Sequence, residues 1–105
     1  MKFLGTGSAL PKKVVSNDDL AQVMDTSDEW IRSRTGIGMR HIAVEEITTS
    51  MAVEAAEKAL ADAKISGCEI DLIIAGTISP DYIFPSLACE VQAAIGAKSA
   101  TAFDL

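Results

Sequence analysis

The chain has 105 residues, so it forms one domain or less, and its 49% hydrophobic content is typical of a folded globular protein. The 15 acidic and 9 basic side chains give a net charge of −6, which excludes the broad basic face that nucleic acid needs, and no run approaches the ~20 apolar residues of a membrane span. Cys68 and Cys89 match no metal-ligating or redox spacing, so we expect no metal site and a reduced, cytoplasmic protein.

The first half of the chain predicts two short strands and two short helices. Residues 2–10 are typical of a short strand with a glycine bend, and residues 12–16 of a connection. A helix is expected from residue 16, capped by Ser16 or Asn17. The next helix covers residues 26–36, where Thr26 and Glu29 have the spacing of a capping box and Gly36 provides the C-terminal stop. Residues 37–44 then alternate weakly, as a strand does.

The second half predicts an alternation of helices and buried strands. A stripe of small residues on one helix face would allow close approach of a neighbour; it comprises Ala52, Ala55, Ala56, Ala59, Leu60 and Ala63. Residues 71–77 form a continuous apolar run, the pattern of a parallel strand covered on both sides. A loop over 78–86, a helix between Ser86 and Gly96, and a strand over 100–105 follow. This order predicts an α/β fold with a mostly parallel sheet, and the final strand suggests the front part of a larger protein.

Several residues that resemble functional motifs have simpler interpretations. The "GTGSAL" stretch lacks the third glycine of a dinucleotide-binding turn, so a bend is favoured. His41 has no apparent catalytic partner and is expected to be a hydrogen-bonded structural residue. Cys89, flanked by apolar residues on a helix, is expected to be a buried free thiol rather than a nucleophile.

Trp30 is the one residue whose chemistry favours a ligand as strongly as core packing. It is the only tryptophan, and Arg34 follows four residues later on the same helix face. An indole beside a guanidinium provides a stacking surface with a positive edge, which suits a planar base that carries phosphates. From the residues alone, burial in the core and ligand binding both remain open.

Five stretches in register, "GTGSALP", "DTSDEWIRSRTGI", "RHIA", "IFPS" and "AFDL", resemble the N-terminal part of β-ketoacyl-acyl-carrier-protein synthase III. The resemblance runs from Gly5 to Leu105. It implies a thiolase-like fold of two similar α/β halves, with residues 1–105 covering most of the first half as a mixed, mostly parallel sheet covered by helices. It also implies a homodimer that condenses acetyl-CoA with malonyl-acyl carrier protein to begin fatty acid synthesis, with coenzyme A thioester as a substrate and no cofactor.

The same resemblance assigns roles to four residues. The tryptophan matching Trp30 stacks on the adenine of coenzyme A, the residues matching Thr26 and Arg34 contact the same nucleotide end, and the phenylalanine matching Phe84 reaches from the dimer interface towards the partner's acyl pocket. The family's nucleophilic cysteine and its histidine and asparagine partners lie beyond Leu105. We therefore expect no catalytic residue within 1–105, and no activity from this chain alone. The alternatives are a non-catalytic half-domain for binding or assembly, and a synthase III-like acyltransferase of secondary metabolism.

Overall fold

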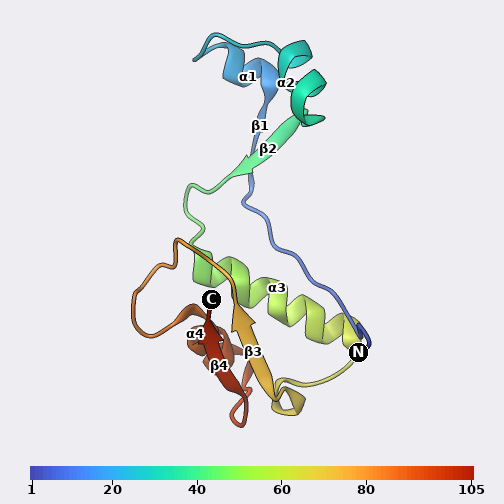
Figure 1. Cartoon of the computed structure of the whole chain (residues 1–105), viewed down its shortest axis with the longest axis vertical. Coiled ribbons are helices and arrows are strands. Elements are labelled where there is room, and N and C mark those ends of the chain that lie inside the picture. Colours follow the sequence, from blue (N-terminus) through green and yellow to red (C-terminus); the bar gives the residue numbers. More distant parts are fainter. The chain divides into compact units, whose positions relative to one another are not determined.

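A computed structural model describes all 105 residues, which form two compact units. Leu10–Glu45 form the first, here called the hairpin unit. Met1–Ala9 and Glu46–Leu105 form the second, the sheet-and-helix unit. No helix is both long enough and apolar enough to cross a membrane. The elements in chain order are β1 (Lys13–Ser16), α1 (Asn17–Ala21), α2 (Asp28–Thr35), β2 (Met39–Ile42), α3 (Thr48–Ala63), the 3-10 helix η1 (Gly67–Glu69), β3 (Leu72–Ala75), α4 (Leu87–Ile95) and β4 (Thr101–Asp104) (Figure 1).

The hairpin unit is built on an antiparallel pair, β1 and β2, in which Val14 lies opposite His41. The prediction of a connection at residues 12–16 was wrong for β1, because these residues pair with β2 along its whole length. Ser16 caps α1 as predicted: its hydroxyl accepts a hydrogen bond from the Asp19 amide, and the Asp19 carboxylate accepts one from the Ser16 amide in return. The strand therefore passes directly into the helix through a reciprocal cap.

Helix α2 begins one residue later than the sequence predicted. Its N-cap is Ser27, whose hydroxyl accepts a 3.1 Å hydrogen bond from the Trp30 amide, so the predicted capping box of Thr26 with Glu29 is wrong. The third residue after Ser27 is a tryptophan, which has no side-chain acceptor to return the bond. The predicted C-terminal stop is confirmed, since Gly36 adopts a left-handed conformation with φ of 72°.

The sheet-and-helix unit contains the parallel pair that the sequence predicted. Strand β3 lies beside β4, and α4 packs on the pair, capped by Ser86 and ended by Gly96 as expected (Figure 1). The four strands do not join one mixed sheet, however: β1 pairs with β2 and β3 with β4, in two separate two-stranded sheets. The buried apolar residues gather around α4 and are Leu87, Ala88, Val91 and Ala97.

Strand β3 is covered on one face only, in contrast to the prediction of cover on both. Leu72 and Ile74 are 52% and 50% exposed, while Ile73 and Ala75 between them are half-buried. Phe103 of β4, paired with Ile74, is also exposed. The alternation leaves an apolar sheet face open to solvent, because side chains in a strand point to opposite faces in turn.

The stripe of small residues on α3 accepts the N-terminal segment of the chain. Gly5 lies so close to α3 that a side chain there would collide with Ala59 and Ala63. The Thr6 amide donates a 2.9 Å hydrogen bond to the Asp62 carboxylate, and Lys58 Nζ donates to the Ser8 carbonyl. The strand predicted for residues 2–10 does not form, because this backbone has no neighbouring strand and bonds to side chains of α3 instead.

Helix α3 starts at Thr48, earlier than the stripe beginning at Ala52 suggested. The Asp81 carboxylate, from the loop between β3 and α4, accepts hydrogen bonds from the Thr48 and Thr49 amides at 3.1 and 2.6 Å. A carboxylate at this position satisfies amides that have no partner within a helix and complements the helix dipole. The extra turn thus depends on a residue distant in sequence, which a local pattern does not reveal.

Candidate functional site

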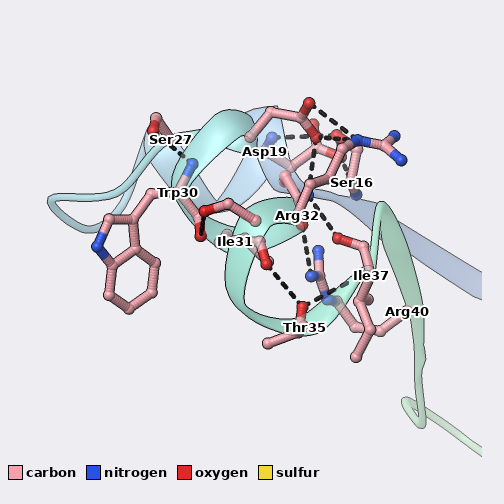
Figure 2. Close-up of polar contacts among 12 residues, drawn as sticks. Ser16, Asp19, Ser27, Trp30, Ile31, Arg32, Thr35, Ile37 and Arg40 are labelled. Carbon is pink, nitrogen blue, oxygen red and sulfur yellow. Dashed lines mark hydrogen bonds and ion pairs between the residues drawn. The ribbon is translucent and has the colours of Figure 1, made fainter.

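Trp30 lies on the surface of α2 rather than in the core. Its side chain leaves the residue 55% exposed, and Figure 2 shows the indole pointing away from the labelled polar cluster. The guanidinium carbon of Arg34 sits 4.7 Å from the centroid of the indole ring. This is a cation–π contact across one turn of the helix, as the i, i+4 spacing predicted. A large aromatic surface therefore remains available beside a fixed positive charge.

A hollow of about 310 Å³ adjoins the indole. Its lining comes from the turn that leads into α2 and from the helix itself: Asp25, Thr26, Ser27 and Trp30. Thr26 is half-buried in this turn, although it is not the helix cap. The structure thus brings Thr26 and Trp30 to one hollow and places Arg34 on the same indole, so all three predicted nucleotide-contacting residues lie together.

The polar face of α2 is fixed by an ion pair along the helix. The Asp28 carboxylate accepts 2.9 Å hydrogen bonds at both oxygens from Arg32 Nε. A hydrogen bond from Asn17, followed by the bond from Arg32, holds the pKa of Asp28 below its ordinary value of 3.8. Arg32 is thus committed to its own helix, whereas Arg34 faces the indole.

Phe84 belongs to the sheet-and-helix unit, so the structure describes it separately from the site on α2. It lies in the loop between β3 and α4 and is 89% exposed, beside Ile83, which is 99% exposed. Asp81 anchors this loop to the start of α3, and the Thr49 amide, as the largest contribution, lowers the pKa of its carboxyl from the ordinary value of 3.8. Ile83 and Phe84 are thus exposed to solvent on a loop that Asp81 anchors.

The residues that resembled catalytic groups have structural contacts. His41 Nδ1 lies 2.6 Å from the Pro11 carbonyl oxygen, which confirms the structural role predicted for it. Cys89 is half-buried, and its thiol donates to the Ala102 carbonyl at 3.8 Å. The exposed Cys68 thiol lies 2.9 Å from the Ser66 hydroxyl. No group of three or more His, Cys, Asp or Glu side chains is arranged to hold a metal ion.

Sequence reasoning missed one residue that bears on this site. Asn17 was considered only as an alternative helix cap, yet its side chain is buried and contacts Asp28 at the start of α2. Its position after a short β-branched strand was the one available signal, and it did not indicate which partners the amide would meet. The long-range partners of Asn17 arise from the pairing of β1 with β2, which brings distant residues together.

Comparison with known proteins gives a consistent result, although no family model matches the chain. The chain is 61% identical over 104 residues to β-ketoacyl-[acyl-carrier-protein] synthase III 1 of Bacillus anthracis, covering 98% of this chain and 34% of that protein. Synthase III of Xylella fastidiosa is 54% identical over 105 residues, with coverage of 99% and 32%. The chain therefore spans about a third of the length of these relatives.

Solved structures agree with the sequence matches. The crystal structure of 3-oxoacyl-[acyl-carrier-protein] synthase III from Aquifex aeolicus superposes with a TM-score of 0.94 at 54% identity, covering 99% of this chain and 34% of that one. The priming β-ketosynthase of the R1128 polyketide pathway gives a TM-score of 0.93 at 37% identity, with coverage of 99% and 31%. These neighbours confirm the thiolase-like fold class. Sequence and fold together place the chain in the β-ketoacyl-[acyl-carrier-protein] synthase III family, in which it corresponds to the N-terminal third of the protein.

Proposed function

We propose that this chain is the nucleotide-binding N-terminal part of an acyltransferase that condenses a short acyl-CoA primer, acetyl-CoA, with malonyl-acyl carrier protein and so initiates fatty acid biosynthesis. The observation that carries the proposal is the 61% identity to a synthase III along almost the whole chain. In this proposal coenzyme A arrives as the thioester substrate and is not a retained cofactor.

The surface of α2 has the chemistry that the adenine end of coenzyme A needs. The exposed indole of Trp30 offers a flat face for a purine, and Thr26 lies in the adjoining hollow with a hydroxyl that can donate or accept. Arg34 carries a charge that suits the phosphates, and its contact with the indole restricts both side chains before the ligand arrives. Binding of the nucleotide would therefore cost less side-chain entropy than binding to mobile side chains.

Phe84 is assigned a second role in this proposal, at a homodimer interface beside the acyl pocket of the partner. The support is its 89% exposure on a loop that Asp81 anchors, which presents an apolar side chain to a protein surface rather than to the core of its own unit. The proposed location is the cytoplasm, where acyl-CoA and acyl carrier protein are both accessible.

A second candidate function is an acyltransferase of secondary metabolism. The observation in its favour is the TM-score of 0.93 to a priming β-ketosynthase of a polyketide pathway, although the identity of 37% is lower than that of the synthase III relatives. Both candidates share the coenzyme A site proposed on α2. They differ in the acyl group accepted, and a comparison of acyl-CoA substrates in a protein that contains this chain distinguishes them.

Calorimetric titration of acetyl-CoA into the chain tests the proposed site. Trp30→Ala should weaken binding by ~1–3 kcal/mol, about 5- to 150-fold in Kd, as loss of aromatic–base stacking does. Val23→Ala is the matched control, because Val23 is 80% exposed in the same unit and does not line the hollow. A Trp30→Ala chain that binds normally but melts at a much lower temperature would show that Trp30 serves packing instead.

A further inference from the structure

Asn17 is the largest side chain that the fold buries completely, with 1% of the residue exposed. Burying an amide costs free energy unless its donors and acceptor find partners. No buried side-chain nitrogen or oxygen lacks a partner in this chain, and Asn17 is no exception. At the first position of α1, Asn17 makes contacts that an apolar side chain would not supply.

The Asn17 amide joins the two ends of α2. Its Nδ2 donates 2.8 Å hydrogen bonds to Asp28 Oδ1, in the first turn of the helix, and to the carbonyl of Ile37, just beyond the Gly36 stop. The backbone amide of Asn17 also donates to the Gly38 carbonyl at 3.1 Å. Asn17 thus forms hydrogen bonds at both ends of α2.

The acceptor side of the same amide is tied to the β-hairpin. Asn17 Oδ1 accepts a 2.6 Å hydrogen bond from Arg40 Nη2, and Arg40 Nη1 donates to the Val15 carbonyl at 3.1 Å. Arg40 belongs to β2 and Val15 to β1, so the guanidinium bridges the Asn17 amide to both strands. Asn17 therefore links α2 to the β1–β2 hairpin through hydrogen bonds.

Helix α2 needs such an attachment because it has little apolar packing to hold it. It is only eight residues long and contains no buried residue. Short helices are marginal in water and normally depend on an apolar face packed against the rest of the protein. Because Ile31 is the one apolar residue of α2 that is even half-buried, polar contacts at the two ends of the helix fix much of its position.

We propose that Asn17 is the positioning residue of the coenzyme A site: it holds α2 so that Trp30, Arg34 and the turn at Thr26 meet the nucleotide in a fixed arrangement. The inference rests on the proposed function for its ligand, and on the contacts of Asn17 for its mechanism. The side-chain hydrogen bonds of Asn17 go to Asp28, Ile37 and Arg40 and not to Trp30, so its effect on binding is indirect.

The variant Asn17→Asp tests the role with almost no change of shape. The carboxylate still accepts from Arg40, but it cannot donate to Ile37 and it repels Asp28. We expect the Kd for acetyl-CoA to rise on the order of tenfold, and the near-ultraviolet circular dichroism of Trp30, the only tryptophan, to weaken without ligand. The control is Asp19→Asn, which disturbs the α1 cap in the same unit without contacting α2.

If Asn17 had a purely structural role, Asn17→Asp and Asp19→Asn would both lower the melting temperature. The two variants would then have the same affinity for acetyl-CoA and the same Trp30 spectrum, and this result would overturn the inference. The swapped pair Asn17→Asp with Asp28→Asn removes the repulsion and restores a donor opposite an acceptor at the start of α2, while the bond to Ile37 and the ion pair with Arg32 stay lost. It should recover part of the lost affinity even if the single variant folds poorly, and no recovery would also overturn the inference. A wild-type chain that binds no acetyl-CoA would refute the proposed function, while the Trp30 spectrum would still test the positioning.

Discussion

Replacing Gly5 with alanine should destabilise the sheet-and-helix unit through a collision with α3. A methyl group at Gly5 would lie 2.5 Å from the Ala63 amide nitrogen and 2.7 Å from the Ala59 carbonyl oxygen, whereas ordinary contact begins at 3.4 Å. The segment must retreat by about 0.9 Å, the difference between 3.4 and 2.5 Å, because helix backbone cannot give way. The hydrogen bond from Thr6 to Asp62, now 2.9 Å, would then exceed its working range.

Overpacking of this kind costs ~1–3 kcal/mol, and each 1 kcal/mol lowers the melting temperature of a chain of this size by about 4–8 °C. Urea and thermal unfolding followed by far-ultraviolet circular dichroism measure the loss. Gly76→Ala is the matched control, because a methyl group there meets no atom within 4 Å and should change stability by less than ~0.5 kcal/mol. Equal unfolding of Gly5→Ala and wild type would refute the close packing of the N-terminal segment on α3.

Three further predictions concern acid, catalysis and assembly. Hydrogen bonds, led by the one from the Thr49 amide, lower the pKa of Asp81 from 3.8 in the folded state. The stability that this carboxylate adds is therefore complete above pH 3.8 and is lost as the pH falls through the lower pKa of the folded state. Thermal melts of Asp81→Asn in acid should lack this part of the pH dependence, and an unchanged dependence would contradict the prediction. The 105 residues alone should transfer no acyl group from acetyl-CoA, because the Cys89 thiol contacts a carbonyl rather than a base; transfer that disappears in Cys89→Ser would reverse this conclusion. The exposed sheet face of Leu72 and Ile74 should make the isolated chain self-associate, and sedimentation as a monomer at every concentration would count against it.

The sequence was most informative where a structure depends on neighbouring residues. Gly36 and Gly96 end helices as predicted, and Ser86 and Ser16 cap them, because capping uses atoms within one turn. The i, i+4 spacing also correctly paired Trp30 with Arg34. The resemblance to synthase III added the thiolase-like fold class, which the solved structures confirm.

The sequence was least informative where partners are distant. The N-terminal segment has the composition of a strand, yet its neighbour is a helix. Helix α3 starts early because of Asp81, and Asn17 is buried because strand pairing brings Arg40 to it. The shift of the α2 cap from Thr26 to Ser27 is a one-residue choice between two hydroxyls that both suit the role. Local chemistry alone does not decide between them.

The proposed coenzyme A site depends most on Trp30 receiving the adenine end of the ligand. Because Trp30 is the only tryptophan, fluorescence excited at a wavelength that Tyr82 does not absorb reports on this indole alone. Titration with coenzyme A should quench that fluorescence to saturation, since a stacked purine covers the exposed ring, whereas 4′-phosphopantetheine, which lacks the nucleotide, should leave it unchanged. No saturable change with coenzyme A, or an equal change with 4′-phosphopantetheine, would contradict the proposed site.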